Sequence, residues 1–188
     1  CEAGTYVSTV GSDLCKDDCR AGSYITDDKR QCSKCDKGLW QDQDNQVGQS
    51  SCKPCSKGKY NDETGITAES DCKICVAGTW NMEAGSKTNC NLCSDGTYNV
   101  NTGSSSKSDC KNDCKAGSYV LSDKSDCLEC PAGYYQEETR KQETKDVPGC
   151  ANCLLGKYNE LEGRSSSSDC KDCGKFFVYL FDSFYYCN

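Results

Sequence analysis

The chain has 188 residues and 20 cysteines, but only 9 leucines, 3 isoleucines, 8 valines and 4 phenylalanines. Its formal net charge is −7, and so few large apolar side chains do not bury enough surface to fold around a hydrophobic core. Composition therefore excludes a Rossmann fold, a barrel and a helix bundle. A cysteine content above about 8–10 % instead predicts a small disulfide-rich scaffold.

The charged and titratable residues narrow the function further. The acidic balance, 29 Asp and Glu against 22 Lys and Arg, offers no surface for nucleic acid. Histidine is absent, which removes the usual acid–base catalyst at neutral pH and the commonest metal ligand, so we expect no enzymatic activity and no cofactor. An even and dense set of cysteines indicates the secretory pathway and an extracellular or cell-surface location.

The cysteines fall into nine close pairs, with Cys1 and Cys187 alone at the ends. The string C-x-x-G-x-[YW] starts at Cys1 and at the second cysteine of every pair except the last, which gives nine matches. Glycine suits a tight turn, the aromatic residue is the one large apolar group of each repeat, and a polar turn then leads back to the next cysteine. The pattern predicts a mostly irregular chain of short β-hairpins, each needing a cross-link because isolated hairpins are marginal.

A longer period lies over the short one. Residues 15–32 match residues 110–127 at 11 of 18 positions, and both segments contain the only C-x-x-x-C pairs. The sequence therefore predicts a first cysteine-rich super-repeat over 1–109, a second over 110–173, and a degenerate aromatic end over 173–188.

Parity of the cysteines favours one disulfide pattern. If each loop closes from the second cysteine of one pair to the first cysteine of the next, all twenty cysteines are used; interleaved pairing between neighbouring repeats is the alternative. About ten single-disulfide loops that touch only their neighbours would form an elongated solenoid or rod. The predicted bridges, which number the repeats from 1 to 10, are Cys1–Cys15, Cys19–Cys32, Cys35–Cys52, Cys55–Cys72, Cys75–Cys90, Cys93–Cys110, Cys114–Cys127, Cys130–Cys150, Cys153–Cys170 and Cys173–Cys187.

The string C-x-x-G-x-Y, a polar stretch and C-x-x-C resembles ephrin-receptor-like and tumour necrosis factor receptor-like cysteine-rich repeats over residues 1–173. In the receptor modules the cysteine before the glycine closes onto the next cysteine, so the resemblance implies sequential pairing. The periodic C-x-x-x-C at Cys15/Cys19 and Cys110/Cys114 also resembles ciliate surface immobilisation antigens. That resemblance implies an extracellular, repetitive protein with a C-terminal lipid anchor, so any membrane attachment is expected outside this chain.

Three other chemistries are less favoured by the pattern. Nine pairs and two single cysteines do not divide into four-thiolate zinc sites without leftovers, and nine equivalent pairs argue against a thioredoxin-type redox centre. The acidic string 42–45 lacks the ligand spacing of an EF-hand, so we expect no metal. The serine runs Ser104–Ser106 and Ser165–Ser168 are candidates for O-glycans, whereas no N-x-[ST] sequon exists.

These observations lead to a non-enzymatic structural protein of the extracellular surface, which self-associates as a coat, surface antigen or filament subunit. The alternative is a receptor or adhesion ectodomain that binds another extracellular protein, and it predicts exposed apolar side chains on only one or two repeats. An aromatic cluster near the C-terminus is the candidate interface, formed by Phe176, Phe177, Tyr179, Phe181, Phe184 and Tyr185.

Overall fold

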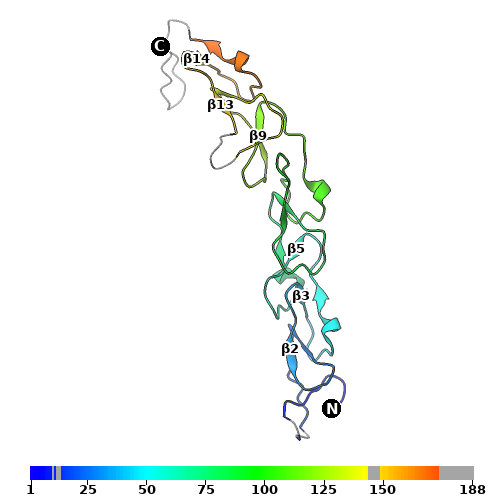
Figure 1. Ribbon diagram of the computed structural model, residues 1–188. Helices are drawn as coiled ribbons and strands as arrows, with labels where there is room; N and C mark the ends of the chain where they lie inside the picture. The colour runs from blue at the N-terminus through cyan, green and yellow to red at the C-terminus, as the bar shows by residue number, and fades with distance from the viewer. Residues whose placement is uncertain (10, 12–13, 144–148, 174–188) are drawn as a thin grey trace. The chain divides into compact units, whose positions relative to one another are not determined.

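The computed structural model describes residues 1–9, 11, 14–143 and 149–173 (Figure 1). Regular structure in this part of the chain consists of very short strands and single-turn 3-10 helices. The strands are β1 (Ser23–Ile25), β2 (Cys32–Lys34), β3 (Leu39–Trp40), β4 (Lys53–Pro54), β5 (Lys59–Tyr60), β6 (Lys73–Ile74), β7 (Thr79–Trp80), β8 (Asn91–Leu92), β9 (Ser118–Val120), β10 (Cys127–Glu129), β11 (Tyr134–Tyr135), β12 (Lys141–Gln142), β13 (Ala151–Asn152), β14 (Lys157–Tyr158) and β15 (Lys171–Asp172). The 3-10 helices are η1 (Gln49–Ser51), η2 (Glu69–Asp71), η3 (Lys107–Asp109) and η4 (Ser167–Asp169).

The strands pair as short hairpins, which confirms the fold class expected from the sequence. The first strand of a hairpin carries the motif aromatic, and the second lies between the two cysteines of the next pair. In this register Trp40 faces Lys53 and Tyr60 faces Lys73. The pairs are β1–β2, β3–β4, β5–β6, β7–β8, β9–β10, β11–β13 and β14–β15, and β12 adds to β9 in parallel.

The motif glycine forms the turn that opens each hairpin. In all nine matches the N–H of the residue after the glycine donates to the carbonyl of the residue two before it, as Thr97 does to Ser94 at 3.0 Å. The glycine occupies the third position of this turn with a positive φ, which is 71° at Gly96. A type II turn requires positive φ at that position, and glycine adopts it without a steric cost.

Nine disulfides run in tandem through the described cysteines, with sequence separations of 13 to 20 residues. They join the pairs that the sequential scheme names, from Cys1–Cys15 to Cys153–Cys170. Loops of this size are each worth about 3 kcal/mol in the chain-entropy model. The tenth predicted bridge, Cys173–Cys187, involves a residue outside the described part of the chain.

Backbone hydrogen bonds join each repeat to the next. The N–H of a motif glycine donates to a backbone carbonyl in the next repeat, that of the residue directly after the motif aromatic. Gly22 donates in this way to Gln41 and Gly38 to Asn61, both at 2.8 Å. In the opposite direction, a turn residue donates its N–H to the carbonyl of the preceding repeat's first cysteine, as Gly65 does to Cys35 at 2.9 Å. Both bonds recur along the chain, so the hairpins are connected by backbone groups rather than by apolar side chains.

Contacts also reach the second neighbour, which corrects the expectation that each repeat touches only adjacent ones. A Cβ on Gly22 would stand 2.3 Å from the carbonyl oxygen of Gly65, although these glycines belong to repeats 2 and 4. The same approach occurs between Gly58 and Gly103, at 2.1 Å. Five motif glycines therefore serve two purposes: each forms its own turn, and each leaves room for the turn of a repeat two places further along. They are Gly22, Gly38, Gly58, Gly96 and Gly117.

The buried interior is made of disulfides and amide side chains. Thirteen apolar residues of the described part of the chain are buried, and all of them are cysteines except Ile25 and Val120, which occupy equivalent positions in the two super-repeats. The motif aromatics are only half-buried, as the burial pattern of every strand that carries one shows. This interior explains how the chain folds with so few aliphatic residues.

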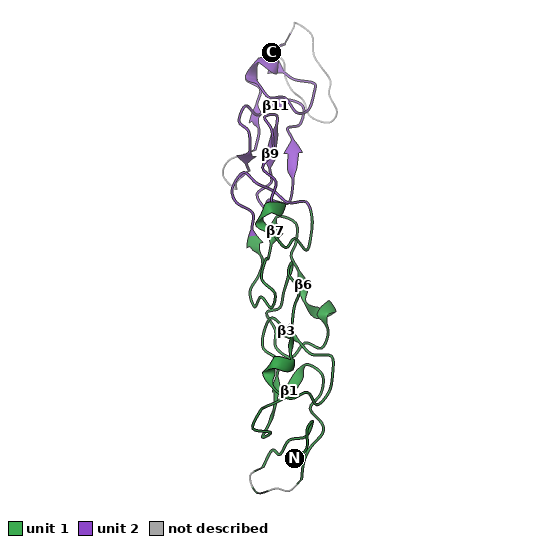
Figure 2. Cartoon of the chain, turned by 90° about the vertical axis from the view of Figure 1, so that its right-hand side faces the viewer, with its two compact units in different colours: residues 1–91, 101–109 green, residues 92–100, 110–188 purple. Residues whose placement is uncertain are grey.

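The chain forms two compact units, residues 1–91 with 101–109 and residues 92–100 with 110–188 (Figure 2). The super-repeat bounds at 109 and 173 rest on sequence similarity and stay a prediction, as does the elongated shape. No helix in the described ranges is both long enough and apolar enough to span a membrane.

Candidate functional site: repeat surfaces and a polar network

The described residues contain no group of three or more His, Cys, Asp or Glu side chains placed to hold a metal ion. One cavity of about 400 Å³ lies beside β11. Its lining includes Gln136, whose amide is already bonded to the carbonyl of Gly149 and to the N–H of Glu138 at 2.9 Å. Because the protein itself satisfies the Gln136 amide, this side chain is not available to orient a ligand.

In six of the nine matches, the residue after the motif aromatic supplies a buried amide that the sequence did not reveal. In repeat 4, Asn61 donates to the carbonyl of Glu63 at 2.9 Å and accepts from the N–H of the same residue at 3.0 Å. Asn81 repeats this pattern in repeat 5 and also donates to the carbonyl of Lys59 at 2.7 Å. The buried amides are Gln41, Asn61, Asn81, Asn99, Gln136 and Asn159. The only sequence signal was that an amide stands after the aromatic in most repeats.

Ion pairs lie along the outer edges of the hairpins. Lys53 contacts Asp42 at 2.7 Å and stands over the Trp40 ring at 4.7 Å, and Lys73 contacts Asp62 at 2.6 Å. The hydrogen bond from Lys53 lowers the pKa of Asp42, and the bond from Lys73 lowers that of Asp62. Because both carboxylates are in contact with water, these pairs modulate stability at the surface rather than hold the fold.

Exposed large apolar side chains are spread along the described chain, from Leu14 in repeat 1 to Leu161 in repeat 9, and repeats 5 and 9 each carry at least two. Val76 and Met82, in repeat 5, are 65 % and 58 % exposed. Leu154 and Leu155 are the two residues before the motif glycine of repeat 9, where no other match has leucine, and Leu155 is fully exposed. The predicted aromatic interface from Phe176 to Tyr185 lies outside the described residues.

The serine runs are partly available to solvent. Ser105 is exposed, whereas its neighbour Ser104 is buried. In the second run Ser165, Ser167 and Ser168 are exposed. The O-glycan prediction therefore narrows to these exposed hydroxyls.

Repeats 2 and 7, which follow the C-x-x-x-C pairs, bond the carbonyl of the preceding repeat's first cysteine with a lysine side chain. Longer repeats bond the same carbonyl with a backbone N–H. Lys29 donates its ammonium to the carbonyl of Cys1 at 2.9 Å, and Lys124 donates to the carbonyl of Cys93 at 2.6 Å. Both lysines have positive φ, 54° and 62°. Their loops are too short for a turn residue to reach the preceding cysteine, so the long side chain makes the bond.

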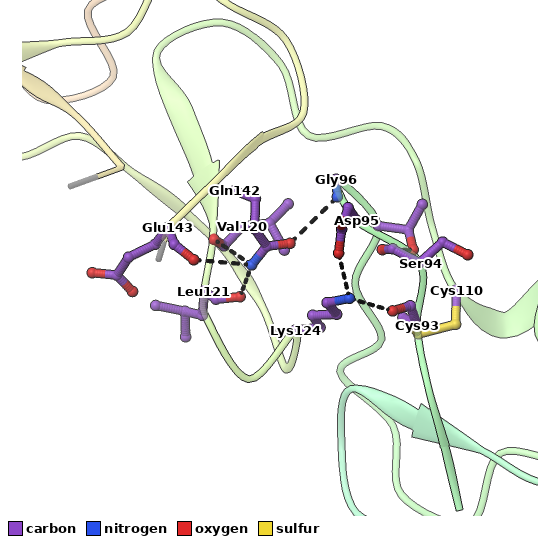
Figure 3. A network of polar contacts seen from close by, with 11 residues as sticks. Cys93, Ser94, Asp95, Gly96, Cys110, Val120, Leu121, Lys124, Gln142 and Glu143 are labelled. Carbon is purple, nitrogen blue, oxygen red and sulfur yellow. Dashed lines mark hydrogen bonds and ion pairs between the residues drawn. A yellow bond between two sulfur atoms is a disulfide. The ribbon is translucent and has the colours of Figure 1, made fainter. Parts of the chain in front are cut away.

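Lys124 belongs to a larger polar network than Lys29 (Figure 3). Its ammonium also contacts the Asp95 carboxylate at 2.8 Å, and the side chain of Lys124 is only 13 % exposed. Beside it, the Gln142 carbonyl oxygen accepts from the Gly96 N–H at 3.3 Å, while the Gln142 amide donates to the carbonyl oxygens of Val120 and Leu121. Two neighbouring residues, Asp95 and Gly96, are thus each held by a side chain from a later repeat.

Comparison with known families explains the repeating geometry. The family model described as tyrosine-protein kinase ephrin type A/B receptor-like matches three segments, residues 22–72, 67–110 and 117–170. A search of the curated proteins finds no match. Repeats of this type, together with the tandem disulfides, point to an extracellular domain. Because the matched segments cover more than half of its length, the chain belongs to the tyrosine-protein kinase ephrin type A/B receptor-like family of cysteine-rich repeats.

Proposed function

We propose that the chain is a structural, non-enzymatic segment of an extracellular surface layer, in the role of a coat, surface antigen or filament subunit. The observation that carries the proposal is the recurrence of the same backbone contacts along the repeats. The bond from the Gly22 N–H to the backbone carbonyl of Gln41 recurs from the Gly133 N–H to the backbone carbonyl of Asn159, at 2.8 Å. Residues committed to holding the array together leave few positions for a specialised site, which suits a protein whose task is to extend and repeat.

Composition supports the same role. Catalysis at neutral pH without any histidine would depend on strongly perturbed carboxyls or lysines, and the shifted carboxyl pKa values in this chain follow from surface ion pairs and turn hydrogen bonds. The proposal includes passage through the secretory pathway and attachment through an anchor outside this chain. It also includes O-glycans on Ser105 or Ser165. Intact-mass measurement of secreted protein before and after β-elimination tests the glycans.

Imaging of native material tests the structural role. Negative-stain microscopy and light scattering of the secreted protein are expected to reveal regular polymers or a two-dimensional lattice that dissolves on disulfide reduction. A protein that stays monomeric at all accessible concentrations, and captures one soluble partner with a defined stoichiometry, would overturn the proposal.

The second candidate is a receptor or adhesion ectodomain, and the observation that favours it is the adjacent exposed pair Leu154 and Leu155; Val76 and Met82 are a second surface to test. The substitutions Val76→Ser with Met82→Ser, and Leu154→Ser with Leu155→Ser, remove these apolar groups without touching the backbone contacts. Binding to an extracellular protein that is lost in one pair and retained in Leu128→Ser, a half-exposed control in repeat 7, would favour the ectodomain. Polymers that form equally well in all variants would favour the structural role.

A further inference from the structure

An acidic residue stands before the motif glycine in one repeat only. Repeat 6 places Asp95 before Gly96, whereas the other eight matches have alanine, lysine or leucine at this position. An aspartyl–glycyl bond is chemically labile, because glycine has no side chain to hinder attack of its backbone nitrogen on the neighbouring carboxyl carbon. The side chain of Asp95 is 92 % exposed, so water has free access to its carboxyl group.

Both groups that would react, the Asp95 carboxylate and the Gly96 N–H, already take part in hydrogen bonds. The Asp95 carboxylate accepts a hydrogen bond from the Lys124 ammonium at 2.8 Å, and the Gly96 N–H donates to the Gln142 side chain at 3.3 Å (Figure 3). Lys124 and Gln142 are themselves held, Lys124 by the carbonyl of Cys93 and Gln142 by the carbonyl oxygens of Val120 and Leu121. The network therefore holds the nucleophile and the electrophile in separate hydrogen bonds.

The first super-repeat provides an internal comparison. There Ala3 occupies the position of Asp95, and Val47 occupies the position of Gln142. Lys29, the counterpart of Lys124, still bonds the carbonyl of Cys1. The carboxylate contact and the glutamine contact are thus found together in the copy that has the aspartyl–glycyl bond, and the lysine–carbonyl bond is common to both copies.

We infer that Lys124 and Gln142 protect the Asp95–Gly96 bond from rearranging to isoaspartate, and that this bond is a latent modification site that reacts when repeats 6 to 8 separate. In the rearrangement the Gly96 nitrogen loses its proton and attacks Cγ of Asp95. The new N–C bond closes a succinimide, and one carboxyl oxygen leaves as water. Water then adds to the ring, and cleavage between the nitrogen and the main-chain carbonyl carbon gives isoaspartate, with no net change in composition.

Each contact opposes a defined part of this reaction. Departure of water requires the protonated carboxyl, and the hydrogen bond from Lys124 lowers the pKa of Asp95, which reduces the protonated fraction. Attack requires the nitrogen lone pair to turn toward Cγ, and the bond to Gln142 holds the Gly96 N–H in another direction.

Rearrangement at Asp95 would also change the contact between repeats 6 and 8. A Cβ on Gly96 would stand 2.8 Å from the carbonyl oxygen of Arg140 in repeat 8. Isoaspartate adds a methylene group to the backbone beside this close approach. We therefore expect the modified chain to lose the contacts between repeats 6 and 8, so that rearrangement makes separation of the repeats permanent.

The test is the rate of isoaspartate formation at residue 95 in the folded, disulfide-bonded protein. The samples are the wild type, Lys124→Ala, Gln142→Val and Lys29→Ala, incubated at neutral pH and analysed by peptide mapping with electron-transfer fragmentation. Methyl transfer by an isoaspartate-specific methyltransferase gives an independent readout. A synthetic peptide with the sequence of residues 94–99 gives the unprotected rate, and Asp95→Ala gives the background.

We expect Lys124→Ala and Gln142→Val each to accelerate rearrangement at residue 95 by about tenfold, the effect of losing one charge-assisted or well-placed hydrogen bond. Lys29→Ala loses the equivalent carbonyl bond but should keep the wild-type rate. Gln142→Val installs the residue found in the first super-repeat, so it keeps the test valid if Lys124→Ala fails to fold. Equal rates in the wild type and the free peptide, or no acceleration in the folded variants, would overturn the inference.

Discussion

Gly38 and Gly85 belong to repeats 3 and 5, yet their backbones lie in direct contact: a Cβ on Gly38 would stand 2.0 Å from the carbonyl oxygen of Gly85. Gly38 also has a φ of 81°, so its conformation and its contact both require glycine. The two requirements can be separated experimentally, because Gly11 has a similar φ of 85° with nothing within 4 Å of its Cβ position.

The first prediction compares alanine at these two glycines. Gly11→Ala bears only the cost of positive φ, about 1 kcal/mol. Gly38→Ala adds a backbone clash and is expected to cost a further 2–4 kcal/mol or so in the free energy of unfolding. Urea denaturation with the disulfides intact measures both. Equal losses in the two variants would show that repeats 3 and 5 do not depend on this approach.

The second prediction concerns the buried amides. Asn61→Ala leaves the N–H and the carbonyl of Glu63 without their side-chain partner, and we expect a loss of about 1–3 kcal/mol. Asn152 is exposed in β13, and Asn152→Ala should change the free energy of unfolding by less than about 0.5 kcal/mol. Thermal unfolding by circular dichroism gives the comparison. A neutral Asn61→Ala would contradict a structural role for the buried amides.

The third prediction is a loss of stability in acid. The pKa values of Asp42 and Asp62 are lower in the folded chain because each carboxylate accepts a hydrogen bond from a lysine. A lowered folded-state pKa adds stability above the unfolded value of about 3.9, and that stability is lost as the pH falls through the folded value. The melting temperature should therefore fall as the pH is lowered below about 4.

Variants assign this acid effect to the ion pairs. Lys53→Ala with Lys73→Ala should flatten the pH dependence, and salt should weaken it in the wild type because the pairs are exposed. Lys57 takes part in none of the described ion pairs, so Lys57→Ala should leave the pH profile unchanged. An unchanged slope in the double variant would assign the acid loss to other carboxyls.

The fourth prediction is the disulfide map. Non-reducing proteolysis should yield peptides that join Cys35 to Cys52 and Cys55 to Cys72, and none that joins Cys52 to Cys55. The paired substitution Cys35→Ser with Cys52→Ser is expected to lower the free energy of unfolding by about 2–5 kcal/mol. A linked peptide from within one C-x-x-C pair would contradict the tandem arrangement.

The hairpins and the sequential cystine loops could be predicted because they depend on spacing, which is visible in one dimension. The contact between Gly38 and Gly85 could not, because a glycine in a turn already has a sufficient local reason to be there. The buried position of Asn61 was missed for a similar cause, since asparagine after an aromatic residue is typical of an exposed turn.

The network around Lys124 joins residues 95, 124 and 142, which no local pattern connects. The signal that could have found it was the difference between the super-repeats, in which Ala3 and Val47 become Asp95 and Gln142. In a repetitive protein, positions at which one repeat differs from the others are therefore the places to look for a specialised contact.

The second-neighbour approach of the glycines limits how such an array can grow or shrink. A block of two repeats contains the contacts between adjacent repeats but none between second neighbours. Three consecutive repeats are the smallest block that contains both. Deleting a repeat gives each affected glycine a new partner, so gain and loss of repeats are tolerated only where the incoming turn also carries glycine, or a residue such as Asn45 or Arg140 that accepts positive φ. The products of homologous recombination within the array would therefore fold only if the turn two repeats away from the crossover accepts the close approach of the glycine.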